Sequence, residues 1–428
     1  MDAMIPEKTS SCFESSSLKI AFIVTEYPKT TETFIMRDVM EFSGHGCELL
    51  IFSLTHFNKL DLLHDFAKPT RAWARDYAYF ASPDVIAAVA YFMWRAPRKL
   101  TRVVYDILRG SWRHPATLLK SLFILPKSLR IARELMLWQA DHIHAAYAGH
   151  PATAAWIIKR MTGIPFSASS HAHDLFETQA LLTTKLPEAE LVRTISNFNK
   201  RFLIEHVPQL AERPPQVIHV GTYLTDNDQR VPLDQIDGFR ILYVGSLEQR
   251  KGVDLLLRAF ARARQPDWQL EIIGDGPERA NLEALARTES LAASVTFKGA
   301  QTNENVRAAM LQSSLLVVPS RIGARNQTEG LPTVIVEAFS ARLPVVATRL
   351  TGIPEIVLHD VTGLLFEMED EAGLANALVR ISSDLAQAAQ WAEAGRALVD
   401  EEFDQRKNAK LLLDQIKKTL PNLNRSTL

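Results

Sequence analysis

Short apolar runs alternate with amphipathic stretches over most of the chain. Strand-like runs at residues 19–25 and 48–54 flank a predicted helix at 33–42, and a second series begins with the run 239–246. That run leads into a stretch with apolar side chains at helical spacing from Val253 to Phe260. Alternating strands and helices are typical of parallel, Rossmann-like sheets. Further strands are predicted at residues 142–147, 165–170, 192–196 and 216–220.

The pattern divides the 428 residues into two series of strands and a helical end. Single cores rarely exceed about 250 to 300 residues, so a chain of this length is expected to form two. We predict an N-terminal domain at 18–230, a C-terminal domain at 238–384 and a helical segment at 385–420, with a polar linker at 231–238. The fold class is therefore α/β with two Rossmann-like domains.

Composition narrows the class of protein. The apolar content of 47% and the formal charge of -1 are typical of a globular protein and do not favour nucleic acid as a partner. Cys12 and Cys47 are the two cysteines, which gives no disulfide framework or zinc site. Residues 1–17 lack the apolar core of a signal peptide, and the apolar run 85–94 is about half a membrane span. We expect a cytoplasmic protein without a transmembrane helix.

A loop followed by an amphipathic helix carries the strongest chemical signal. Glu329 and Glu337 are separated by seven residues, and Gly330, Leu331 and Pro332 lead from the loop into the helix. A helix begins readily at proline, and its free amides form an anion site. Carboxylates beside such a site can accept hydrogen bonds from hydroxyls. The ligand implied is a sugar joined to a diphosphate, although two glutamates can also simply occupy a solvated helix face.

This spacing resembles the E-x7-E signature of retaining glycosyltransferases of family 4, which have the GT-B architecture. The match extends over residues 315–321, 329–348 and 352–366. The resemblance implies a cleft between two Rossmann-like domains, a last helix that crosses back to the first domain, and retention of anomeric configuration. It also implies that Glu329 binds hydroxyls of the transferred sugar and Glu337 binds the ribose.

Two cations follow the first strand of the second series. Arg250 and Lys251 lie in the turn after a strand that ends at Gly245 and Ser246. Ligands in open α/β sheets bind at the carboxyl ends of strands, where two cations suit a diphosphate leaving group. Family members often carry arginine where this chain has Ser246, and Arg250 is the available substitute. An ordinary basic loop is the alternative.

The next strand ends in a glycine turn. Gly274 and Gly276 in EIIGDGPE resemble the family's contacts to the nucleotide base and ribose. The third glycine of a dinucleotide fingerprint is missing, so NAD is not favoured.

Candidate acceptor contacts lie in the first loop. The sequence EYPKTTETFI at 26–35 resembles the opening of exopolysaccharide and colanic-acid-type glycosyltransferases, so Thr31, Glu32 and Thr33 are candidates. A helix cap by Thr31 or Thr33 is an equally good interpretation, since a cap needs only a hydroxyl.

Histidines cluster in the first domain. His171 and His173 in SSHAHDLF resemble the family's cleft histidine loop, His171 as the catalytic candidate and His173 as an acceptor contact. The alternative is a metal-dependent hydrolase, because HAHD resembles half of the H-x-H-x-D-H signature. The closing histidine is missing, since positions 175 and 176 are Leu and Phe. We therefore expect no metal site. His142, His144, His150 and Asp174 are the other groups that could join such a cluster.

Residues 85–138 match no motif but are strongly basic. Apolar side chains recur at helical spacing from Leu100 to Leu108 against Arg98, Lys99 and Arg102. A basic amphipathic helix is typical of an anionic membrane surface, where a lipid-linked acceptor would be found. Packing of the apolar face on its own domain is the alternative.

Together these features predict a metal-independent glycosyltransferase that needs no cofactor. Its partners would be a nucleotide-diphosphate sugar, a lipid-linked oligosaccharide acceptor and the inner face of the cell membrane, in polysaccharide assembly. Epimerases and phosphorylases share similar folds, so fold alone does not exclude them.

Overall fold

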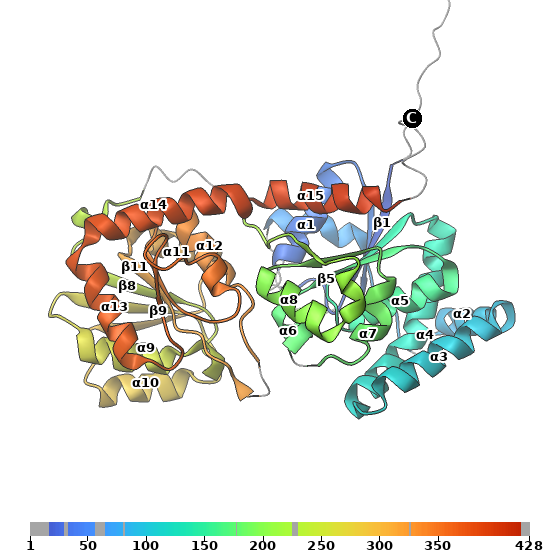
Figure 1. Cartoon of the computed structure of the whole chain (residues 1–428), viewed down its shortest axis with the longest axis horizontal. Helices are drawn as coiled ribbons and strands as arrows, with labels where there is room; N and C mark the ends of the chain where they lie inside the picture. Colours follow the sequence, from blue (N-terminus) through green and yellow to red (C-terminus); the bar gives the residue numbers. More distant parts are fainter. Residues whose placement is uncertain are drawn as a thin grey trace, which may run out of the picture.

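The computed structural model describes residues 17–29, 33–55, 65–79, 82–176, 178–224, 230–324 and 327–420. Two parallel sheets lie side by side along the long axis of the molecule (Figure 1). The structure therefore has the α/β architecture of two Rossmann-like domains that the sequence predicts.

The first sheet has the order β3-β2-β1-β4-β5-β6-β7, and each described strand pair is parallel. Helices α1 (Thr33–Gly44), α5 (His150–Thr162) and α8 (Asn197–His206) connect its strands. The strands are β1 (Lys19–Val24), β2 (Glu48–Ser53), β3 (Ala74–Arg75), β4 (His142–Ala145), β5 (Phe166–Ser170), β6 (Leu191–Thr194) and β7 (Gln216–Val217).

The second sheet has the order β10-β9-β8-β11-β12-β13 and is also parallel. Its strands are β8 (Phe239–Val244), β9 (Trp268–Ile273), β10 (Val295–Gly299), β11 (Leu315–Val318), β12 (Val345–Thr348) and β13 (Leu364–Phe366). Its helices are α9 (Val253–Ala263), α10 (Arg279–Thr288), α11 (Asn303–Gln312), α12 (Thr333–Ser340) and α13 (Glu371–Ser383).

Central strands in both sheets are almost completely buried. Strands β1 and β11 are almost continuous apolar runs, because helices cover both faces of a parallel sheet, whereas β4 also buries two histidines. Phe34, at the start of α1, packs against core side chains of both domains. The first turn of α1 therefore lies at the boundary between the domains.

The end of the chain returns to the first domain. Helix α14 (Leu385–Glu402) packs on α12, and α15 (Gln405–Lys418) packs on α1 (Figure 1). Between them, Asp404 caps α15 by accepting hydrogen bonds from the amides of Arg406 and Lys407. The connector at Thr222 pairs with this point, since its amide donates to Phe403 at 3.1 Å and its carbonyl accepts from Gln405 at 3.1 Å. The predicted return of the last helix is confirmed.

Three helices are inserted between β3 and β4 of the first sheet. They are α2 (Pro83–Arg95), α3 (Pro97–Ser111) and α4 (Pro115–Trp138), at the end of the molecule away from the second domain (Figure 1). Val103 and Ile107 of α3 are buried in the core of the first domain. The apolar face that the sequence offered to a membrane therefore packs inward for most of its length, because the neighbouring helices α4 and α5 supply apolar partners for it.

One of the ten basic residues in this segment is also buried. Lys127 has no exposed side-chain surface and pairs with Asp76 at 2.9 Å, and its ammonium donates to the Leu54 carbonyl at 3.1 Å.

Within the described parts of the chain, no helix is long and apolar enough to cross a membrane.

Candidate functional site

Three side chains from distant segments meet at the carboxyl edge of the second sheet. Arg250 and Lys251 lie in a short 3-10 turn after β8, and Glu329 lies in the loop before α12. The Glu329 carboxylate pairs with the Arg250 guanidinium, and with the Lys251 ammonium at 2.8 Å. Glu248, which the sequence did not single out, also binds Arg250: its Oε2 accepts a hydrogen bond from Arg250 Nε at 2.8 Å. The structure thus brings three of the four catalytic candidates together.

Backbone contacts fix the loop that carries Glu329. The Thr351 hydroxyl donates to the Glu329 carbonyl and to the Gly330 carbonyl at 3.2 Å, and the Gly352 amide donates to Gly330 at 3.0 Å. Leu331 is buried, and Pro332 stands at the N-cap of α12 with extended backbone angles. Helix α12 therefore begins at Thr333 and points its free amides toward this loop.

Gly274 and Gly276 lie against the loop that follows β8. A Cβ at Gly274 would fall 1.8 Å from the Gly245 carbonyl oxygen, and one at Gly276 would fall 2.5 Å from that of Leu247. Ser246 joins this packing, since its carbonyl accepts a hydrogen bond from Tyr243 Oη at 2.9 Å. The two loops need glycine in order to pack on each other, whichever ligand they contact.

Glu337 lies apart from the Glu329 cluster. It lines a hollow of about 140 Å³ with Arg37, Tyr223 and Arg307. Burial raises the pKa of Glu337, and the Arg37 guanidinium opposes that shift. Arg37 belongs to α1 of the first domain and is itself nearly buried. The second glutamate of the E-x7-E pair therefore faces a cation of the other domain, and its assignment to the ribose stays a prediction.

His171 follows β5 and is held as a neutral ring. Burial, with Arg193 as the next largest cause, lowers its pKa to about 3. Its ring lies 4.8 Å from that of Phe34 and 5.1 Å from that of Tyr147, measured between centroids. Because Phe34 packs on both domains, His171 lies close to the boundary between them.

Of the other acceptor candidates, the structure describes the side chain of Thr33 alone. Thr33 is the first residue of α1 and is half-buried. Thr31, Glu32 and the side chain of His173 lie outside the described residues.

Two of the other histidines, on β4, serve the core of the first domain. His142 and His144 on β4 are fully buried and each bonds the Ser167 hydroxyl at 2.8 Å. Both oxygens of Asp174 accept hydrogen bonds from backbone amides, those of Ala148 and His171. No group of three or more possible metal ligands occurs among the residues that the structure describes. The hydrolase alternative finds no support in this arrangement.

A clasp between the domains was not found from the sequence, although its glutamate lies in the GIPEIV match. The Glu355 carboxylate of the second domain accepts hydrogen bonds from the amides of Asn197 and Phe198, each at 2.7 Å. These amides form the first turn of α8 in the first domain, whose positive end favours a carboxylate. Glu355 thus joins the domains next to the loop that holds Glu329.

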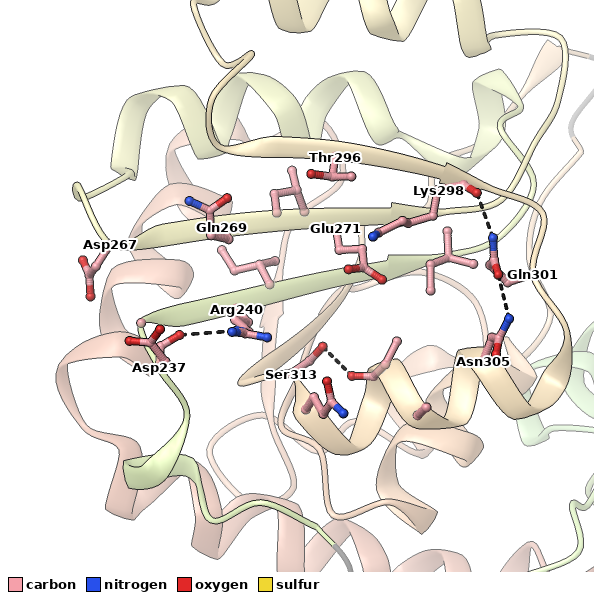
Figure 2. Close-up of a pocket in the computed structure, with 17 residues that line it drawn as sticks. Asp237, Arg240, Asp267, Gln269, Glu271, Thr296, Lys298, Gln301, Asn305 and Ser313 are labelled. Carbon is pink, nitrogen blue, oxygen red and sulfur yellow. Dashed lines mark hydrogen bonds between the residues drawn. The ribbon is translucent and has the colours of Figure 1, made fainter.

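A larger hollow of about 1000 Å³ lies over the face of β8, β9 and β10, and Figure 2 shows its polar side chains. None of the predicted site residues lines it. Several of its side chains bond to neighbours in the same hollow, as Arg240 does to the Asp237 carbonyl at 3.3 Å and Asn305 to Gln301 at 2.9 Å. We therefore place the candidate site at the edge of the sheet and not on this face.

Comparison with known families agrees with the cluster at Glu329. The family model described as glycosyl transferases group 1 matches residues 226–398, which include Arg250, Lys251, Glu329 and Glu337. Residues 226–398 belong to the group 1 glycosyltransferase family. The glycosyltransferase is 25% identical over 407 residues to the amylovoran biosynthesis glycosyltransferase AmsK of Erwinia amylovora, covering 91% of this chain and 96% of that protein. It is 23% identical to the putative colanic acid biosynthesis glycosyltransferase WcaL of Escherichia coli, covering 91% and 97%.

Solved structures confirm that the glycosyltransferase has the GT-B fold. A glycosyltransferase from Rickettsia africae superposes with a TM-score of 0.70 at 17% identity, covering 95% of this chain and all of the other. The Anabaena protein HepE in complex with UDP gives a TM-score of 0.69 at 18% identity, covering 94% of this chain and all of the other. At these identities the likeness concerns the fold alone.

Proposed function

We propose that this enzyme transfers a sugar, with retention, from a nucleotide-diphosphate sugar to a lipid-linked glycan in exopolysaccharide assembly. The observation that carries the proposal is the meeting of Arg250 and Lys251 with Glu329 at the edge of the sheet, before the amino end of α12. The relatives named for amylovoran and colanic acid biosynthesis support the class of product. The UDP complex of HepE supports a nucleotide-linked donor.

The cluster suggests how the three side chains divide the work. Without donor, Glu329 balances the charge of both cations. A donor diphosphate would take over Arg250 and Lys251, which then stabilise the charge that develops on the leaving group. The carboxylate of Glu329 becomes free to accept hydrogen bonds from hydroxyls of the sugar. Neutral His171 can donate one hydrogen bond and accept another near the same boundary.

These cations and the helix end allow us to propose that transfer needs no metal ion. The test is a transfer assay over a panel of nucleotide sugars, with release of nucleotide measured with and without a lipid-linked acceptor and with EDTA. We expect release that depends on acceptor and survives EDTA. Release without acceptor would indicate an epimerase or hydrolase, and loss of turnover that is restored by manganese would contradict metal independence.

We also propose that α2–α4 dock the enzyme on the inner face of an anionic membrane. Ten of the sixteen large apolar side chains that are exposed in the described residues lie between residues 86 and 137. Trp94 is 80% exposed, Leu119 70% and Trp112 65%. Aromatic side chains suit the interface of a bilayer, and exposed cations attract its headgroups. The exposed cations of these helices are Arg95, Arg98, Lys99, Arg102, Arg109, Arg113 and Lys120.

Co-sedimentation with vesicles tests this docking. Wild type should pellet with anionic vesicles. A Trp94→Ser/Trp112→Ser variant should stay largely in solution, because each substitution removes a large apolar contact with the bilayer interface. A matched control, Val379→Ser/Leu411→Ser, changes two exposed apolar side chains on other helices and should pellet like wild type. Equal pelleting of all three proteins would contradict the proposal.

A further inference from the structure

The first domain contains a pocket of about 410 Å³ that the sequence did not predict. Thr25, Tyr147 and Asp174, which follow β1, β4 and β5, line its inner wall. These positions are the carboxyl ends of neighbouring parallel strands, the usual place for a ligand in a doubly wound sheet. The outer wall comes from the first turns of the inserted helix α4, at Thr117 and Lys120.

The lining combines cations with hydroxyl groups. Its basic side chains are Lys29, Lys120, His150 and Lys185, and its threonines are Thr25, Thr117, Thr153 and Thr178. Asp174 is the one carboxylate of the described lining, and backbone amides already occupy both of its oxygens. Ammonium and hydroxyl donors around one cavity are suited to an anion with several oxygens.

Lys185 presents a buried ammonium to this pocket. Its side chain is almost fully buried, and its Nζ donates to the Gly149 carbonyl at 2.7 Å and to the Thr153 hydroxyl at 3.0 Å. An ammonium has three N–H groups, so one remains for a ligand. Burial lowers the pKa of Lys185 to about 7, and burial together with Lys185 and Lys120 lowers that of His150 to about 4. An anion in the pocket would favour the charged forms of these groups.

The rim of the pocket continues into the exposed apolar surface of the inserted helices. Leu119, which is 70% exposed, lies between the pocket residues Thr117 and Lys120 on α4. Trp112 is exposed just before the same helix begins. A ligand with a charged head in the pocket and an apolar chain outside it would meet suitable surfaces at both ends.

We propose that this pocket binds the phosphate or diphosphate group that joins the acceptor glycan to its lipid. The inference rests on the proposed transfer to a lipid-linked acceptor, and it assigns the anchor group of that acceptor to the first domain. The sugar end of the acceptor could then extend from the edge of the first sheet toward His171 and the cleft. This assignment depends on the chemistry of the pocket lining and not on the cluster of Arg250, Lys251 and Glu329.

The experiment measures binding of geranyl diphosphate and of inorganic diphosphate by calorimetry to an Arg250→Ala/Lys251→Ala protein. This background removes the cations of the donor cluster, so that diphosphate bound there does not obscure the pocket. Lys120→Gln and His150→Gln are then added singly, with Lys410→Gln as the control. Lys410 is exposed on α15, away from the pocket lining.

We expect geranyl diphosphate to bind more tightly than inorganic diphosphate. Lys120→Gln should weaken its binding about ten-fold, as for the loss of one charge-assisted contact, and His150→Gln should weaken it less, as for the loss of a neutral hydrogen bond. Lys410→Gln should change nothing. Unchanged affinity in both pocket variants would overturn the proposal. Equal affinity for the two probes would assign the pocket to a free anion and overturn the link to a lipid. Because no sugar is transferred in this assay, its failure is separate from failure of the proposed function.

Discussion

Both domains bring charged side chains from distant segments together, but they bury them to different degrees. In the second domain, Arg250, Lys251 and Glu329 meet at a sheet edge and keep part of their surface exposed. In the first domain, Asp38 and Arg193 form an ion pair at 2.7 Å whose side chains are almost fully buried. The exposed cluster can exchange partners with a ligand, whereas the buried pair cannot do so without leaving a charge unpaired.

The buried pair also joins more of the chain. Asp38 accepts a second hydrogen bond from Gln405 at 2.7 Å, and Arg193 donates to the carbonyls of Ile218 and His219. These residues link α1, β6 and α15. The same chemical groups therefore hold the first domain together and, in the second domain, remain available for chemistry.

The largest expected effect is on stability. Asp38→Ala leaves the Arg193 charge buried, and loss of one partner of such a pair costs about 3 to 5 kcal/mol. The free energy of unfolding should fall by that amount in urea, while turnover per folded molecule stays near normal. Asp275→Ala, which breaks an exposed pair with Arg279 at 3.2 Å, is the control and should cost less than about 1 kcal/mol. Similar losses in both variants would remove the distinction between the two kinds of pair.

A variant of the exposed cluster should show the opposite pattern. Lys251→Ala and Glu329→Gln remove contacts to the donor, and we expect transfer to fall roughly 10²-fold or more. Unfolding in urea should change by only about 0.5 kcal/mol, the usual range for surface substitutions. Arg258→Ala on α9 removes a nearby cation outside the cluster and should retain activity. Near-normal turnover of Lys251→Ala at saturating donor would contradict the assignment.

The buried histidines of the first domain predict a dependence on pH. Burial lowers the pKa of His144 to about 3, so the unfolded chain takes up its proton first, near pH 6.5. The stability from the neutral ring is complete above pH 6.5 and is lost as the pH falls toward 3. Between pH 6.5 and 5 the loss should be about 1 to 2 kcal/mol for this group. Urea midpoints of His144→Gln should fall less steeply with pH than those of wild type, and parallel curves would contradict the prediction.

The smallest effect concerns the clasp between the domains. Glu355→Ala removes the acceptor of the Asn197 and Phe198 amides, and loss of such a helix-end contact costs about 1 kcal/mol. We expect a slightly larger radius of gyration by X-ray scattering without donor, since the two domains can then separate at this edge. Glu367→Ala, which breaks an exposed pair with Arg349, should leave the radius unchanged.

The sequence predicted the strands, helices and turns that depend on local periodicity and turn chemistry. Strands such as β1 and β8 followed from apolar runs, and the place of Arg250 and Lys251 followed from the rule that ligands bind at the carboxyl ends of strands. The ion pairs of these two cations with Glu329 were not predicted. The direction of α3 did not follow, because its apolar face gives no indication whether neighbouring helices or a lipid will cover it. Glu337 could not be placed either, since its partner Arg37 is 300 positions away in the other domain.

The two places where the chain passes between the domains are joined to each other. Thr222 pairs with the backbone around Asp404, so the outgoing connector and the returning segment form one short double-stranded link. A chimera that exchanges donor domains between such enzymes therefore needs two cuts, one on each strand of the link. A hybrid that is joined only at the first connector would cover α1 with a foreign α15, and its specificity could not be separated from the stability of that mismatched interface.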